Sequence, residues 1–151
     1  MGKPDVMARA ALPLLVSAAF ACVDAGDYEG VWVGEAAGEG ETREGFERGD
    51  ALEVEIMEAD LGDLRAEISS SDGLFEDEPI EPIPGAEQDA LADITFPGSP
   101  LRVFLAFADT TDGEGPALVV LALYGDPSVE VRILRGGAAP LYGIFSLERR
   151  R

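Results

Sequence analysis

A strict alternation of apolar and polar residues is the clearest structural signal in this chain. Residues 51–58 read ALEVEIME, so Leu52, Val54 and Ile56 share one face and glutamates dominate the other. After a Leu-Gly-Asp turn, residues 64–68 (LRAEI) continue the same alternation. A period of two residues is that of a half-buried β-strand. The two runs therefore predict an antiparallel hairpin with one face toward a core.

Six further runs have the composition of strands and are separated by turns rich in Gly, Pro and Asp. Between Leu74 and Gln88, three prolines and an acidic run predict a loop or an edge excursion, because proline lacks the N–H that a central ladder needs. The eight runs together predict an all-β fold, an antiparallel up-and-down barrel of about eight strands, with a β-sandwich as the alternative. The six further runs are residues 28–35, 90–96, 101–108, 117–124, 128–134 and 141–149.

The same alternation predicts which side chains fill the barrel. A barrel of this size is filled by side chains or holds one small ligand. Residues 117–123 (ALVVLAL) are apolar on both faces, which predicts a covered outer surface, a sandwich or a subunit contact. The predicted inward set is bulky and favours a packed core over a ligand cavity: Leu52, Val54, Ile56, Leu64, Ile68, Val103, Leu105, Phe107, Val129, Val131, Ile133, Phe145 and Leu147.

The first 22 residues have the pattern of a bacterial export signal. Lys3 and Arg9 form a basic region, and the apolar run that follows, residues 10–21, is too short to span a bilayer as a helix. Small residues at Ala19 and Ala21 then precede the only cysteine, Cys22.

This segment resembles a bacterial lipoprotein signal, which implies that Cys22 becomes the first residue and carries a diacylglycerol membrane anchor. Val23 after it implies outer-membrane sorting. Ordinary cleavage near Ala21 or Ala25, giving a periplasmic or secreted protein, is the second interpretation, and a cytoplasmic protein with a buried N-terminal helix is the third. We expect an extracytoplasmic protein with a cleaved signal helix (1–21), a tether (22–27) and one β-barrel domain (28–151).

Charge and composition exclude several kinds of chemistry. The chain carries 30 Asp and Glu against 11 Lys and Arg, a net charge of −19 that repels nucleic acid. With no histidine and one cysteine, it lacks Ser-His-Asp catalysis and the usual ligands of a zinc site. We therefore expect a protein that is not an enzyme and has no cofactor.

Two acidic segments are weak candidates for a calcium site, since hard cations take carboxylate oxygens. The better one comprises Asp109, Asp112 and Glu114, and the second is residues 76–78. Neither has the spacing of an established calcium loop, so we favour solvated surface charge and no metal.

Gly30-Val31-Trp32 resembles the G-x-W of the first strand in the lipocalin and avidin superfamily of small barrels, and residues 141–149 are similar to a closing strand of that type. The resemblance implies that Trp32 packs at the barrel floor against a basic residue of the last strand, and strand parity selects Arg149. It further implies a carrier of a small apolar ligand. The alternative is a structural or protein-interaction module of the envelope with a filled core, using an acidic face or the two-sided apolar run. The sequence determines neither the ligand nor the oligomeric state.

Overall fold

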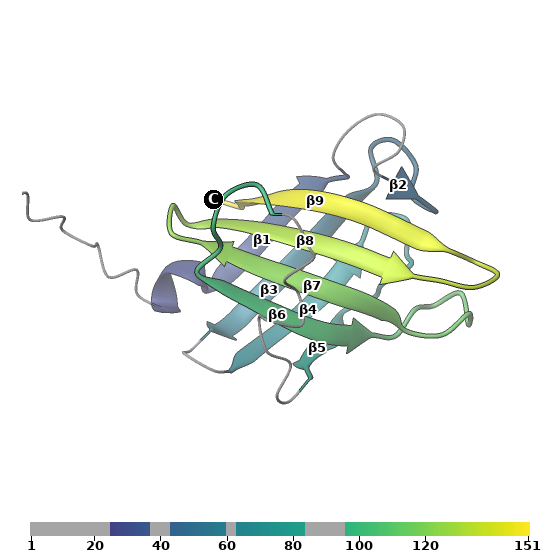
Figure 1. The fold of residues 1–151 in the computed structure, drawn as a ribbon, viewed down its shortest axis with the longest axis horizontal. Helices are drawn as coiled ribbons and strands as arrows, with labels where there is room; N and C mark the ends of the chain where they lie inside the picture. Colours follow the sequence, from purple (N-terminus) through teal and green to yellow (C-terminus); the bar gives the residue numbers. More distant parts are fainter. Residues whose placement is uncertain (1–24, 37–42, 60–62, 84–95) are drawn as a thin grey trace, which may run out of the picture.

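The computed structural model describes residues 25–36, 43–59, 63–83 and 96–151, and within them the chain is all-β. Eight antiparallel strands run in the order β1-β3-β4-β5-β6-β7-β8-β9, and a β1–β9 pairing closes them into a barrel (Figure 1). The predicted barrel is therefore confirmed, while the predicted signal helix and Cys22 lie outside the described residues. A short 3-10 turn, η1 (Ala25–Tyr28), precedes the strands, which are β1 (Gly30–Glu35), β2 (Arg43–Glu44), β3 (Ala51–Ala59), β4 (Leu64–Ser70), β5 (Glu78–Pro82), β6 (Arg102–Ala108), β7 (Ala117–Tyr124), β8 (Ser128–Arg135) and β9 (Leu141–Arg149).

The β3–β4 hairpin has the predicted register. Val54 pairs with Ile68 and Ile56 with Ala66, and all four side chains are buried. The register shifts by one residue at Met57, where a bulge bends β3. Burial of one face at every second residue fixes this pairing, because a slip by one position would expose the whole apolar set.

One contiguous apolar core fills the barrel, and every barrel strand contributes to it. Its largest fully buried side chains include Trp32, Phe75 and Phe145. The inward positions predicted in β3, β4, β8 and β9 are all buried.

The predicted parity of β6 is wrong. Phe104, Ala106 and Ala108 face the core, whereas Val103 and Leu105 are only partly buried and Phe107 is 53% exposed. The strand reads RVFLAFA and is apolar on both faces, so alternation alone does not select the inward side. The inward side of β6 thus carries one large side chain, Phe104, and two small ones, Ala106 and Ala108.

The proline-rich segment is also corrected: residues 78–82 form β5, between β4 and β6. Its ladders are short, with three register pairs to β4 and two to β6, so two prolines cost few hydrogen bonds. Of the predicted run 90–96, all but Phe96 lies outside the described residues. Tyr28, predicted at the start of a strand, belongs to η1. Among the described residues, no helix has the length and hydropathy needed to cross a membrane.

Candidate functional site

Trp32 of β1 and Arg149 of β9, the pair that the resemblance implies, are in contact in the structure. Trp32 is 1% exposed, and its indole Nε1 donates a hydrogen bond of 2.7 Å to the carbonyl oxygen of Tyr28. The guanidinium carbon of Arg149 lies 5.7 Å from the centroid of the Trp32 ring, and the guanidinium donates to the carbonyl oxygen of Glu29. The Tyr28 hydroxyl donates to the carbonyl oxygen of Tyr124. These contacts join η1 and the ends of β1, β7 and β9.

These contacts are structural: they are hydrogen bonds to backbone carbonyl oxygens and one cation–π contact. Burial raises the pKa of Tyr28 above its ordinary value, which keeps the hydroxyl protonated as a donor. The Arg149 cation over the indole ring is a contact of about 0.5–2 kcal/mol. Each donor named above bonds to a backbone carbonyl oxygen, so these contacts tie η1 to β1, β7 and β9.

The acidic β6–β7 turn holds the better calcium candidate, and there Asp112 is bonded to Arg135. The carboxylate accepts bonds of 2.6 and 3.0 Å from the Arg135 guanidinium and one of 2.7 Å from the Thr110 hydroxyl. The side-chain bond from Arg135 is the main reason that the pKa of Asp112 lies well below its usual range. Asp109 and Glu114 do not join it in a cluster, because among the described residues no three acidic side chains are arranged to hold a metal ion.

The second acidic candidate, residues 76–78, is similarly occupied by protein contacts. Asp77 has a positive φ of 50°, and its carboxylate accepts a bond of 2.7 Å from the Ser69 hydroxyl. Its backbone N–H donates to the same Ser69 oxygen at 3.1 Å. The turn is thus held against β4, and Glu78 belongs to β5.

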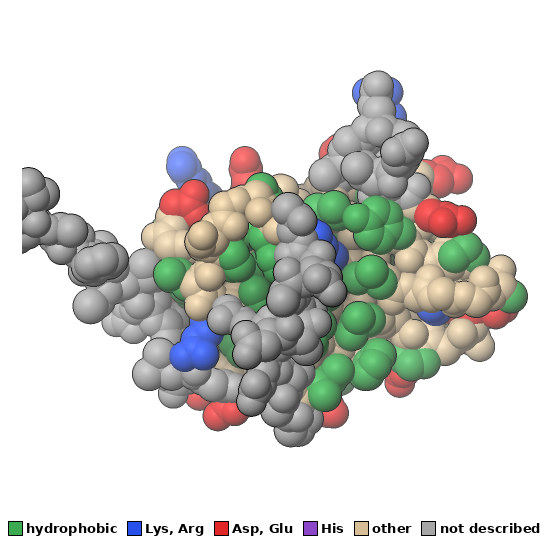
Figure 2. Space-filling model, in the orientation of Figure 1, with side chains coloured by type: hydrophobic (Ala, Val, Ile, Leu, Met, Phe, Trp, Pro, Cys, Tyr) green, Lys and Arg blue, Asp and Glu red, His purple; other side chains and the backbone are tan. Residues whose placement is uncertain are grey.

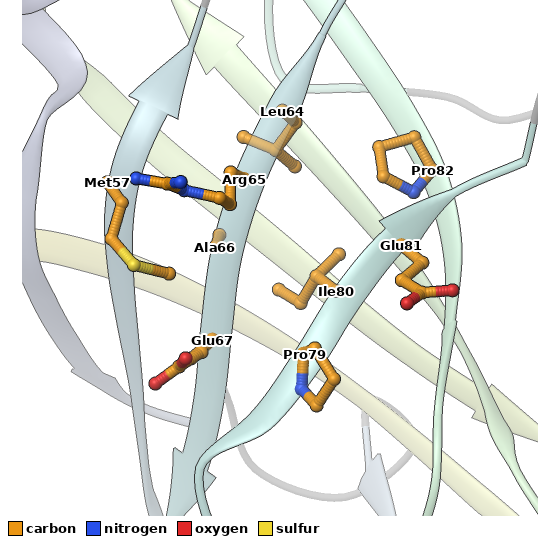
Figure 3. A pocket seen from close by; sticks show the side chains of 9 residues that line it. All are labelled: Met57, Leu64, Arg65, Ala66, Glu67, Pro79, Ile80, Glu81 and Pro82. Atoms are coloured by element: carbon orange, nitrogen blue, oxygen red, sulfur yellow. The ribbon is translucent and has the colours of Figure 1, made fainter.

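A groove of about 590 Å³ lies over β3, β4 and β5 (Figure 3). It forms where the β4–β5 ladder is short, since β4 pairs with β5 only at residues 66–68. Leu64 and Ile80 line it as buried apolar side chains, and Met57 lines it from β3. Arg65 and Glu81 add charge to its lining. The groove can take a small, largely apolar molecule on the barrel wall.

Some apolar side chains on the outer surface of β6–β9 are also buried. Val120 and Ala122 point away from the barrel core and are nevertheless fully buried. The predicted covered outer surface is therefore present at Val120 and Ala122, whereas Leu118, the other outward residue of this run, is partly exposed.

A buried ion pair on this outer surface has no counterpart among the residues predicted from the sequence. Arg132 Nε lies 2.7 Å from Glu130 Oε1, with side chains 11% and 6% exposed. The Arg132 guanidinium also lies 4.6 Å from the centroid of the Phe96 ring. The available signal was the spacing of these charges, two residues apart on a strand that pairs with the two-sided apolar run.

A smaller depression of about 310 Å³ lies at the β7–β8 turn, with Asp126, Glu130 and Glu148 in its lining. Tyr124 also lines it, and its buried hydroxyl oxygen has no hydrogen-bond partner among the described residues. The pKa of Tyr124 is raised above its ordinary value, mainly because the side chain is buried. These groups are uncharged or acidic, so the depression disfavours anionic ligands. Comparison of the chain with protein-family models, curated proteins and solved structures gives no match.

Proposed function

We propose that this protein is a non-enzymatic interaction module of a bacterial cell envelope, anchored to a membrane through Cys22. The observation that carries the proposal is a barrel whose interior is packed with its own side chains while four neighbouring strands also present apolar side chains outward. A filled interior leaves the outer surface as the place where a partner binds. The export signal and its cysteine support the location.

The ionic contacts support a role without catalysis. Asp112 is neutralised by Arg135, and Glu130 by Arg132. The Arg149 guanidinium lies over the Trp32 ring. Each of these groups stabilises the fold, so none is an activated acid, base or nucleophile.

Intact-mass analysis of the full chain, expressed with its own signal in a bacterial host, tests the anchor. We expect loss of residues 1–21, a mass gain of one diacylglycerol on Cys22 and recovery in the membrane fraction. Cys22→Ser is the control and should give an unlipidated chain. An uncleaved wild-type chain would contradict the proposed location.

Native mass spectrometry of the purified protein tests the interaction module against a carrier of ligand in the barrel. We expect equal native and denatured masses, because the described side chains form one contiguous apolar core inside the barrel. A small molecule that is lost only on denaturation would contradict the filled-core module.

The groove over β3–β5 favours one second candidate, carriage of a small apolar molecule on the barrel wall. Its support is the apolar contribution of Leu64, Ile80 and Met57. Saturable binding of the neutral fluorescent probe N-phenyl-1-naphthylamine, abolished by Met57→Asp and retained in Val33→Asp on β1, would favour this candidate. Equal binding by both variants would count against it.

A further inference from the structure

Four apolar side chains form a line across the outer surface of β6–β9. Phe107 pairs in register with Leu118, Leu118 with Leu134, and Leu134 with Tyr142. These four residues, which we call the apolar row, all point away from the core. Phe107 is 53% exposed, and the other three are partly exposed. Figure 2 shows hydrophobic side chains gathered on this face of the molecule.

Carboxylates flank the apolar row at both ends. Glu81 of β5 pairs in register with Phe107, and Glu44 of β2 pairs with Tyr142. Both glutamates are exposed, and neither takes part in an ion pair between described residues. With strands about 4.8 Å apart, the apolar row is about 14 Å long and the two flanking positions are about 24 Å apart.

The outer faces of β3 and β4 are different. On β3 the outward positions include Glu53 and Glu55, and on β4 they include Arg65 and Glu67. The apolar row therefore contrasts with the charged outer faces of β3 and β4, in a chain with a net charge of −19.

The negative charge of the chain favours some binding partners of this surface over others. Two copies of so acidic a chain repel each other, and an anionic lipid surface repels it as well. A segment with apolar residues at its centre and basic residues at both ends complements the row and its flanking carboxylates. An α-helix of about 16 residues spans about 24 Å, and apolar residues at positions i, i+4, i+7 and i+11 cover about 16 Å of it.

We propose that the apolar row, with Glu44 and Glu81, binds an amphipathic helix that carries basic residues near both ends. This inference rests on the proposed interaction function and names the chemistry of its partner. The four apolar side chains supply the buried contact, while the two carboxylates set its position along the row.

Fluorescence anisotropy with a labelled synthetic peptide tests the proposal. The probe is an 18-residue Leu/Lys peptide with leucines on the centre of one helical face and lysines at both ends, and a scrambled peptide of identical composition is its control. We expect the amphipathic peptide to bind wild-type protein at least about tenfold more tightly than the scrambled one. Equal affinity for both peptides would reduce the interaction to general charge attraction and overturn the proposal.

Matched variants locate the binding. Phe107→Ser should weaken the amphipathic peptide about tenfold, whereas Val33→Ser, an outward apolar-to-polar change on β1, should change affinity less than about twofold. The pair Glu44→Lys and Glu81→Lys should weaken binding more than Glu55→Lys and Glu67→Lys, which alter net charge equally. Equal effects within either comparison would overturn the assignment to the apolar row. Circular dichroism checks that each variant is folded.

Two further measurements distinguish the other occupants. Sedimentation velocity that reveals a dimer dissociated by Phe107→Ser would assign the row to a second copy and overturn the proposal. Binding to phosphatidylethanolamine–phosphatidylglycerol vesicles, if lost in Phe107→Ser, would assign it to lipid and also overturn it. Failure of peptide binding leaves the mass measurement on Cys22 unaffected, so failure of this inference and failure of the proposed anchor are separable.

Discussion

Gly34→Ala is expected to open the seam at which β1 meets β9. The seam is short, with register pairs Trp32–Arg149 and Val33–Glu148 and a single bridge from Ala36 to Phe145. Gly34 lies between them, directly against the β9 backbone. A Cβ there would overlap the carbonyl oxygen of Ser146 and lie 2.9 Å from its carbonyl carbon.

The magnitude follows from this geometry. Carbon atoms in ordinary contact are about 3.5–4.0 Å apart, so β1 and β9 must separate by about 1 Å. The obstructing atoms are backbone of a paired strand, so no side-chain rotation relieves the overlap. Overpacking of this kind costs about 1–3 kcal/mol, and each seam hydrogen bond lost adds about 1 kcal/mol. A total near 3 kcal/mol corresponds to a fall in Tm of about 10 °C for a barrel of this size.

Thermal unfolding measures the effect through the fluorescence of Trp32, the only tryptophan in the chain and a member of the seam. Gly136→Ala is the matched control, because nothing lies within 4 Å of an added Cβ there and its φ, like that of Gly34, is suited to any residue. The control should stay within about 0.5 kcal/mol of wild type. Equal Tm values for Gly34→Ala, Gly136→Ala and wild type would refute the steric account of the seam.

Three other changes test the remaining contacts. Arg132→Leu should destabilise the barrel by about 3–5 kcal/mol, because it leaves Glu130 buried without its cation. Changing both residues to Leu should have almost no effect on the free energy of unfolding. Additive losses of the two single changes in urea unfolding would contradict this expectation. The pKa of Asp112 is lowered on folding, so its contribution to stability is present above about pH 4 and is lost as the pH falls further. Asp112→Asn should therefore be less stable than wild type at pH 7 and approach it at pH 2, and a gap independent of pH would be the contrary result. Arg149→Met should lower stability by about 1–2 kcal/mol and alter the emission of Trp32, whereas an unchanged spectrum would separate the two side chains.

The sequence predicts this fold best where strand faces differ in polarity. Glutamates alternate with Leu52, Val54 and Ile56 in β3, so only one register buries the apolar set. The same contrast identifies the inward face of β8 and β9. Trp32 and Arg149 were paired by resemblance and strand parity, and both signals are local to the first and last strands.

Prediction fails where that contrast is missing. β6 is apolar on both faces, so its own sequence does not distinguish the side that faces the core. Pro79 and Pro82 predict a loop or an edge excursion where the structure has β5, because proline opposes ladder formation. The ladders of β5 are so short that the lost donors matter little. The contact between Arg132 and Phe96 is equally non-local, since it joins a residue before β6 to β8.

The order of the strands has a consequence for how the chain can be rewired. Apart from the short β2, each pairing around the barrel except β1–β9 joins strands that follow one another along the sequence. The start of β1 and the end of β9 lie side by side at the seam. The barrel is therefore a closed ring of sequence-consecutive strands, in which only the β1–β9 pairing joins the two ends of the strand order. Linking those two ends and cutting the chain at Gly136 would preserve every ladder while making β8–β9 the pair that must be brought together from a distance. Such a permutant changes which contacts are local, and with them the route of folding, while leaving the native contacts as they are.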